Sequence, residues 1–308
     1  MPLSRYEFEV LRYLEELGAG EYPIRHLSDT LCLSGNTVLQ VINELQNHQF
    51  LLKNDARIHL TEAGLEALEP YRVKRAIILA AGFGSRMMPA TQDRPKPMVT
   101  VNGVRILDTL LDALVAADIR EITIIGGYCF DKLHDLLEKY PFVNLIENRD
   151  YNSTNNISSA MLALPALHDG CYLCEADLYI TNPQVITKYQ YASNILGSYS
   201  LETDDWSFKM VDGYAADYKK GNTYCYNYYG ISYWTPEDCE KLKRDFAEVF
   251  HSPGGKDYFW EFIPLVLKKD DYQVEIRPCR KQDIMEIDNY YELAQLDESY
   301  RREGEDRS

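Results

Sequence analysis

The sequence has no long hydrophobic run and fewer basic than acidic residues. These two features disfavour a membrane-spanning protein and one that binds polyanions. No stretch of the 308 residues approaches the 18 or more apolar residues of a membrane-spanning helix. The opening residues, MPLSRYEFEV, lack the basic and then apolar segments of a secretion signal. Lys and Arg number 32 against 48 Asp and Glu, which gives a formal charge of -16. Because this charge repels polyanions, nucleic acid and membrane surfaces are disfavoured as partners, and we expect a cytoplasmic protein.

Cysteine is present, but its arrangement does not indicate disulfides or a zinc site. The seven cysteines are scattered along the chain, and their odd number suits reduced thiols. Cys171 and Cys174 form a C-x-x-C inside CYLCEADLYI, an apolar run that predicts a buried strand. Neither a second such pair nor a histidine at zinc spacing accompanies them, so we expect no metal or redox role there.

Residues 1–72 have a pattern of their own. Apolar residues at helical spacing predict a first helix that ends at Gly18 and Gly20, and two more helices in IRHLSDTL and NTVLQVINELQNHQF. The stretch FLLKNDARIHLTEAG predicts two strands joined by a turn at Asn54-Asp55, before a last helix over 62–70. Three helices followed by a hairpin resemble a winged helix-turn-helix domain.

The charges of residues 1–72 do not suit DNA binding, the usual role of a winged helix. This segment has six Arg or Lys against eleven Asp or Glu, and its third helix contains Glu44 but no cation. Phosphate neutralisation supplies most of the binding free energy for DNA. We therefore expect a regulatory module or one that forms a homodimer.

After Pro70-Tyr71-Arg72 the pattern changes to alternating strands and helices. AIILAAG, EITIIGG and FVNLIEN predict buried strands, and ILDTLLDALVAADI and FDKLHDLLEKY predict the helices between them. A tyrosine-rich strand over 223–234 and helices over 236–250 and 257–268 follow. This alternation predicts an α/β domain over 73–300, with a doubly wound mixed sheet and helices on both faces. The last residues, 301–308, are expected to form a flexible tail.

The run LAAGFGSRMMPATQDRPKPMV, Leu79–Val99, carries the strongest chemical signal. A buried strand ends in the small residues of 80–85, whose backbone N–H groups can surround an oxyanion. Arg86 and Lys96 then supply cationic donors suited to phosphate oxygens. The third glycine of the dinucleotide fingerprint is missing, because Met87 stands there. The run predicts a phosphate-binding loop of another kind.

Two acidic segments offer metal ligands. Asp177 follows the strand CYLCEAD, and a carboxylate at the carboxyl end of a parallel strand faces the crevice where such sheets bind ligands. Glu286 and Asp288 alternate on an extended segment, which puts both on one face. Mg²⁺ is typically held by one or two carboxylates together with phosphate oxygens. With the loop, these acids predict Mg²⁺-dependent chemistry on a phosphate ester.

The loop and the acids together resemble the signature of the sugar-phosphate nucleotidyltransferase superfamily. That signature is L-A-A-G-x-G-x-R followed by P-K-P, with a strand-end Asp and a distant E-x-D box. The resemblance implies that Arg86 contacts the departing pyrophosphate of an NTP and that Lys96 contacts the reacting phosphate. It also implies that Asp177 and Asp288 bind the metal, assisted by Glu286. The nucleotide-binding residues that it implies are Leu79, Ala80, Ala81, Gly82, Phe83, Gly84, Ser85, Tyr128, Asn156 and Ser159.

Further segments resemble the bacterial CTP:phosphocholine cytidylyltransferases, over residues 74 to about 295. They are ENRDYNSTNNISSA, the Glu-Ala-Asp box, Asp205-Trp206, GISYW, DYFWE and EIDN. The resemblance implies CMP transfer from CTP to phosphocholine, which gives CDP-choline and pyrophosphate. Quaternary ammonium groups bind in aromatic cages, although such aromatics are also common in cores. The acceptor-binding residues predicted in this way are Trp206, Tyr233, Asp257, Tyr258 and Trp260.

Two details depart from the cytidylyltransferase pattern, and two other functions stay open. Thr154 before the Asn pair and Cys129 after Tyr128 differ from the family, so the preference for cytosine rests on likeness alone. One alternative is a sugar-1-phosphate nucleotidyltransferase that uses UTP or dTTP, whose hexose pocket needs more hydrogen-bonding groups and fewer aromatics. The other is a winged-helix regulator with a transferase-like ligand-sensing domain.

Overall fold

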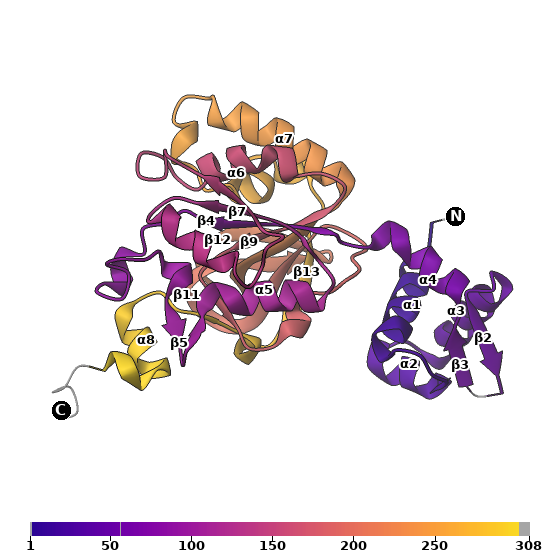
Figure 1. The fold of residues 1–308 in the computed structure, drawn as a ribbon. Coiled ribbons are helices and arrows are strands. Elements are labelled where there is room, and N and C mark those ends of the chain that lie inside the picture. The colour runs from indigo at the N-terminus through magenta and orange to yellow at the C-terminus, as the bar shows by residue number, and fades with distance from the viewer. Residues whose placement is uncertain (1, 56, 302–308) are drawn as a thin grey trace. The chain divides into compact units, whose positions relative to one another are not determined.

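The computed structural model describes residues 2–55 and 57–301, and the chain forms two compact units (Figure 1). Unit 1 comprises residues 1–72 and 189–191, and unit 2 comprises residues 73–188 and 192–308. The predicted tail lies outside the described residues except for Arg301. Within the described ranges, every helix is too short or too polar to cross a lipid bilayer.

Unit 1 contains the predicted helices and hairpin in the predicted order. Ser4 caps the first helix, because its hydroxyl accepts from the Glu7 N–H while the Glu7 carboxylate accepts from the Ser4 N–H at 2.8 Å. The short strand β1 adds a third strand by pairing with β3. Assignment to the winged helix-turn-helix class stays a prediction. The elements are α1 (Arg5–Leu17), β1 (Tyr22–Pro23), α2 (Ile24–Leu31), α3 (Gly35–Asn47), β2 (Leu51–Asn54), β3 (Arg57–Leu60) and α4 (Glu62–Leu68).

The core of unit 1 includes a segment from much later in the sequence. Tyr189 is buried among the apolar side chains of the helices. The ring of Tyr191 lies 5.3 Å from that of Phe8 and is stacked 5.5 Å from that of Tyr71. Its hydroxyl donates to the carbonyl of Leu3 at 3.2 Å. Residues 189–191 therefore complete a core that the sequence pattern assigned to residues 1–72 alone.

Unit 2 is built on the mixed sheet that the sequence predicted. Its strand order is β11-β13-β12-β9-β4-β7-β8. The strands β9, β4, β7 and β8 run parallel, whereas β12 pairs antiparallel with β9. The strands are β4 (Arg75–Ala80), β7 (Glu121–Gly126), β8 (Asn144–Glu147), β9 (Cys171–Glu175), β11 (Asn194–Val211), β12 (Tyr214–Trp234) and β13 (Glu275–Cys279).

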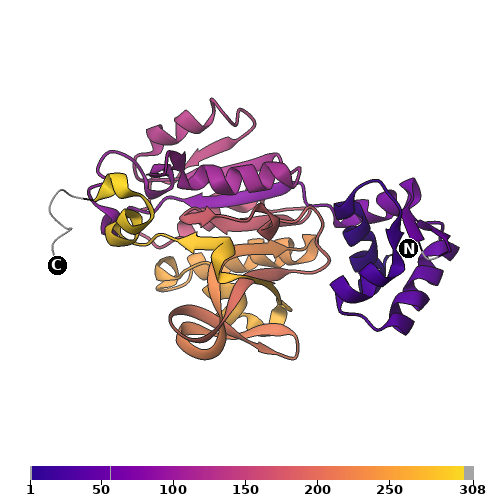
Figure 2. The ribbon, with the colours of Figure 1, turned by 90° about the horizontal axis from the view of Figure 1, so that it is seen from below.

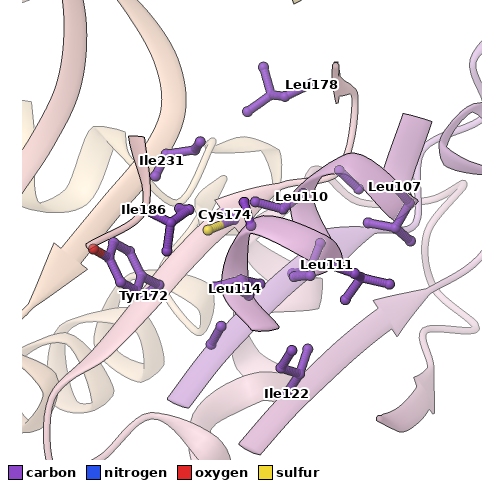
Figure 3. Close-up of a cluster of buried hydrophobic side chains, with 14 of the residues drawn as sticks. Leu107, Leu110, Leu111, Leu114, Ile122, Tyr172, Cys174, Leu178, Ile186 and Ile231 are labelled. Atoms are coloured by element: carbon purple, nitrogen blue, oxygen red, sulfur yellow. The ribbon is translucent and has the colours of Figure 1, made fainter. Parts of the chain in front are cut away.

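Helices cover both faces of this sheet, as expected. Helix α5 (Ile106–Ala116) lies along one face, and α6 (Ile157–Ala163) and α7 (Pro236–Phe250) lie on the other (Figures 1 and 2). The leucines of α5 recur at helical spacing and pack on the sheet side chains Tyr172 and Cys174 (Figure 3). Cys174 is fully buried there, so the strand predicted around the C-x-x-C is confirmed.

Two predicted helices of unit 2 differ in the structure. FDKLHDLLEKY forms a 3₁₀ helix over Phe130–Leu136, whose buried residues Leu133 and Leu136 are three apart, which matches three residues per turn. The helix predicted over 257–268 is absent as a continuous element. A 3₁₀ turn over Gly255–Asp257 and a π turn over Ile263–Leu267 replace it. Pro264 contributes to this break, because it has no N–H for an intrahelical hydrogen bond.

Candidate active site

The phosphate-binding loop predicted from the sequence follows the central strand β4 directly. Gly84 has a φ of +61°, and a Cβ there would lie only 2.9 Å from the Cβ of Lys96. Glycine is therefore required both by the backbone and by the close packing of the loop against the Lys96 turn. The Thr91 hydroxyl donates to the Gly84 carbonyl at 2.9 Å and holds the two segments together. Gly82, Phe83 and Ser85 are exposed at the tip of the loop.

A small separate sheet brings the two acidic segments together. Strand β10 (Leu178–Ile180) pairs antiparallel with β14 (Ile284–Glu286), with Leu178 opposite Glu286. Asp177 stands just before β10 and Asp288 just after β14. Antiparallel pairing puts the start of one strand beside the end of the other. This explains how carboxylates 111 positions apart in the sequence come to share one site.

The predicted catalytic residues form one connected cluster of ion pairs. Lys96 is 8% exposed, and its Nζ lies 3.0 Å from Asp177 Oδ2 and 3.2 Å from Asp288 Oδ1. Arg86 Nη1 lies 3.1 Å from the other oxygen of Asp288, Oδ2. Burial alone would lower the pKa of Lys96, but attraction to Asp177 and Asp288 outweighs it and raises that pKa. The ammonium group therefore stays charged.

The three predicted metal ligands are close enough to share one ion. Asp177, Glu286 and Asp288 each offer a carboxylate oxygen, and these oxygens all lie within 4.8 Å of one another. Hard oxygen donors of this kind suit Mg²⁺, so the residues fit the predicted metal. Burial, then repulsion from Asp177 and Asp288, raises the pKa of Glu286 to about 8. Such a concentration of negative charge favours a divalent cation.

Apart from Gly82, Gly84 and Ser85 of the loop, the predicted nucleotide-binding residues are residues 79–81, the pair Phe83 and Tyr128, and the pair Asn156 and Ser159. Leu79, Ala80 and Ala81 are buried, so only their backbone could reach a ligand. The exposed ring of Phe83 stacks on Tyr128 with centroids 4.2 Å apart, and the Tyr128 hydroxyl donates to the carbonyl of Gln92 at 3.0 Å.

Ser159 is buried, whereas Asn156 is partly exposed and engaged by other side chains. Ser159 is 1% exposed, and its hydroxyl accepts from Asn148 at 2.9 Å. The side-chain amide of Asn156 donates to Glu175 Oε1 at 3.3 Å and to Glu261 Oε2 at 3.5 Å. Its oxygen accepts from the backbone N–H of Trp260 at 2.8 Å. The structure thus links Asn156 to the predicted acceptor side of the site.

The predicted acceptor residues are only partly brought together. Trp206 is partly buried and stacks on Tyr218, with centroids 5.2 Å apart and planes 15° apart. Tyr258 is 37% exposed and its ring lies 6.4 Å from that of Phe262, whose ring also contacts Trp206. Asp257 is exposed nearby in sequence, on the 3₁₀ turn.

Two of the aromatic residues predicted to contact the acceptor are core residues instead. Tyr233 is 5% exposed and packs edge to face on Tyr172, in the α5 face of the sheet. Trp206 packs against the core on the other face of the sheet, so Tyr233 and Trp206 cannot line one cage, and the assignment of Tyr233 to the acceptor is corrected. Trp260 is 1% exposed between core aromatics, and only its indole N–H reaches the site, where it donates to Glu175 Oε1 at 3.0 Å.

The sequence places Glu261 near the predicted aromatic residues, but it does not predict that Glu261 pairs with Glu175, which is partly buried. Glu175 ends β9, and Glu261 is 6% exposed and accepts from the Tyr218 hydroxyl at 3.5 Å. Within residues 2–55 and 57–301, no lysine or arginine pairs with either group. Glu175 belongs to the Glu-Ala-Asp box and Glu261 to the DYFWE run, so both stood inside recognised segments. Their closeness could not be predicted, because 86 positions separate them.

Burial and mutual repulsion shift the pKa values of these carboxyl groups. The pKa of Glu175 is raised well above its usual range by burial and then by Glu261 and Asp177. Burial raises the pKa of Glu261 to about 7, against hydrogen bonds from Asn156 and Tyr218. The influence of Asp177 on Glu175 also shows that this pair lies near the predicted metal ligands. A cation bound between the pair would relieve the repulsion.

Comparisons with known proteins find similarity to nucleotidyltransferases, as the sequence motifs predict. Residues 76–193 match the family described as the MobA-like NTP transferase domain. The 2-aminoethylphosphonate cytidylyltransferase of Lancefieldella rimae is 35% identical over 73% of this chain and 92% of the relative. The choline-phosphate cytidylyltransferase of Haemophilus influenzae is 30% identical over 71% of this chain and 96% of that protein. Among solved structures, the CTP:phosphocholine cytidylyltransferase of Streptococcus pneumoniae aligns with a TM-score of 0.68 and 28% identity, over 75% of this chain and all of that one.

Proposed function

This chain belongs to the cytidylyltransferases among the MobA-like NTP transferases, and we propose that it transfers CMP from CTP to a small acceptor. The proposed acceptor is zwitterionic, with a phosphorus group at one end and a primary ammonium group at the other. The leading acceptor is 2-aminoethylphosphonate. Phosphocholine, the acceptor predicted from the sequence, is the second candidate. We rank 2-aminoethylphosphonate before phosphocholine because of the carboxyl pair of Glu175 and Glu261.

The reaction needs no nucleophile from the protein. A phosphonate or phosphate oxygen of the acceptor forms a bond to the α-phosphorus of CTP, and the bond from that phosphorus to the β-phosphate oxygen breaks in line. Pyrophosphate leaves with the electron pair, and the product is the CMP ester of the acceptor. Lys96 would hold the reacting phosphates, while Arg86 and the N–H groups of the loop would hold the pyrophosphate. Mg²⁺ held by Asp177, Glu286 and Asp288 would neutralise phosphate charge.

The carboxyl pair favours a primary over a quaternary ammonium group. A primary ammonium carries three N–H donors, and the oxygens of Glu175 and Glu261 supply acceptors where no cation of the described residues pairs with them. A trimethylammonium group donates no hydrogen bond and depends on aromatic faces. Of the predicted cage, only Trp206 and Tyr258 stay candidates, and Trp206 already stacks on Tyr218. That aromatic surface is the observation that keeps phosphocholine as the second candidate.

The test is pyrophosphate release with CTP, UTP, ATP or GTP crossed with different acceptors. The acceptors are 2-aminoethylphosphonate, phosphoethanolamine, phosphocholine and glucose-1-phosphate, each with Mg²⁺ and with EDTA. We expect turnover with CTP that EDTA abolishes, and a higher kcat/KM for 2-aminoethylphosphonate than for phosphocholine. A preference for phosphocholine would restore the acceptor predicted from the sequence. Turnover with glucose-1-phosphate and UTP alone would refute the proposal.

Unit 1 is proposed to be a winged helix with a regulatory or homodimerising role. Its third helix, α3, exposes neutral side chains such as Asn36, Gln40, Asn43 and Asn47 and contains no Lys or Arg. A helix of this kind can contact bases but cannot neutralise backbone phosphates. Salt-dependent retardation of genomic DNA fragments by the purified chain would contradict this assignment.

A further inference from the structure

The cations of the site contact three of the oxygens that could hold a metal ion. Lys96 Nζ lies between Asp177 and Asp288, 3.0 and 3.2 Å from one oxygen of each. Arg86 takes the second oxygen of Asp288 at 3.1 Å. Both oxygens of Asp288 are therefore engaged by cations. These are the same two side chains that the resemblance assigns to the phosphates of the nucleotide.

Lys96 and a divalent ion would compete for the same oxygens of Asp177 and Asp288. Mg²⁺ binds carboxylate oxygens at about 2.0–2.1 Å. An ion that uses the Asp177 and Asp288 oxygens would therefore share them with an ammonium group that lies about 3 Å from each. Like charges this close repel each other. Because Lys96 is 8% exposed, its ammonium has little room to withdraw into solvent.

We propose that Lys96 acts as a placeholder cation, which neutralises the metal-binding carboxylates of the empty enzyme and moves to the phosphates of the nucleotide when the metal takes its place. Arg86 makes the same exchange at the outer oxygen of Asp288. The inference rests on the proposed function, since it takes the metal and CTP as the ligands. It goes beyond that function by assigning two successive partners to each of these cations.

The exchange has a consequence that runs against the usual effect of removing an active-site residue. In the empty enzyme Lys96 competes with the metal, so its loss should tighten metal binding while it abolishes turnover. The CTP phosphates give Lys96 another partner, so nucleotide binding should favour metal binding, and by linkage the metal should favour nucleotide binding. A lysine that only contacts phosphate would leave the affinity for metal alone unchanged.

The experiment is an EPR titration of the full chain with Mn²⁺ alone, without nucleotide. We compare wild type with Lys96→Met, which keeps the length of the side chain and removes its charge, and with Arg86→Gln. Lys74→Met is the matched control, since Lys74 is exposed and precedes the other end of β4. We expect Lys96→Met to bind Mn²⁺ about tenfold more tightly or better, within the usual range of coupling between sites. Arg86→Gln should give a smaller gain, and the control none.

The outcomes separate this inference from the proposed function. Mn²⁺ affinity that is equal or weaker in Lys96→Met, with an unchanged circular dichroism spectrum, overturns the placeholder. If Lys96→Met does not fold, Arg86→Gln decides, because the Arg86 side chain is 69% exposed and its loss does not disturb a core. Tighter Mn²⁺ binding in an enzyme that shows no CTP turnover would refute the proposed function and leave the exchange at the carboxylates intact.

Discussion

Replacing Glu261 by glutamine removes one charge from the carboxyl pair and keeps the size of the side chain. If the pair binds an ammonium group, the variant loses a charge-assisted hydrogen bond. Such bonds contribute about 1.5–3 kcal/mol, which corresponds to an acceptor KM about 10- to 150-fold higher. The CTP KM should change less than the acceptor KM, because Glu261 contacts Tyr218 and reaches the predicted nucleotide-binding residues through a single hydrogen bond from Asn156.

The same substitution should make the empty protein more stable. Burial raises the pKa of Glu261 to about 7, so the folded state binds its proton more tightly than the unfolded state does. Stability then falls as pH rises from the unfolded pKa of about 4.3 through about 7, and the loss is complete above that value. Glutamine carries no such penalty. Above pH 7 the variant should therefore melt at a higher temperature than wild type.

Two measurements on the same variant test the predicted rise in acceptor KM and the predicted rise in melting temperature. Initial rates of pyrophosphate release at saturating CTP, from pH 6 to 8.5, give the acceptor KM, which in wild type should fall as Glu261 ionises. Thermal unfolding without substrates gives the stability. The control is Glu240→Gln, because Glu240 is exposed on α7 and its ion pair with Lys243 contributes little. An unchanged acceptor KM would refute the ammonium site, and a lower melting temperature would refute the argument about the buried charge.

Three further predictions concern other parts of the chain. Lys96→Ala should lower kcat/KM at least about a hundredfold, measured by pyrophosphate release, because it removes a preorganised charge donor; near wild-type turnover would remove Lys96 from the reaction. Gly230→Ala should raise the acceptor KM and lower the melting temperature, since Gly230 has a φ of +63° and a Cβ there would lie 2.5 Å from Glu175 Cγ; full activity would show that Glu175 can shift freely. Tyr191→Ala should destabilise unit 1 by about 2–4 kcal/mol and leave kcat unchanged, because the ring stacks on Tyr71 in that core; unfolding curves that match wild type would contradict this.

Much of the fold and the charged centre of the site could be predicted because each signal is local. The strand β4 and the loop after it are contiguous in sequence, and so are the apolar positions of α5. The three acids near positions 177 and 288 were placed together through the family resemblance, and the pairing of β10 with β14 supplies the physical reason.

The parts that could not be predicted depend on contacts between distant segments. The packing of residues 189–191 in unit 1 leaves no mark in the sequence, since a tyrosine-rich stretch suits any core. The prediction for Tyr233 rests on its aromatic ring and on the segment GISYW, and the period of a strand does not show which face carries the site. The pair of Glu175 and Glu261 arises only when the end of β9 meets the turn after residue 257.

The distribution of charge in the site argues for the acceptor class beyond the individual contacts. At one end, Lys96 and Arg86 stand among the predicted metal ligands, which would suit the phosphates of both proposed substrates. At the other end, Glu175 and Glu261 have no cation among the described residues. An acceptor with phosphorus at one end and an amine at the other would satisfy both ends in a single orientation, which would direct its oxygen toward the proposed nucleotide site. A hexose phosphate carries no ammonium group for the carboxyl pair, which makes the sugar branch the less favourable assignment.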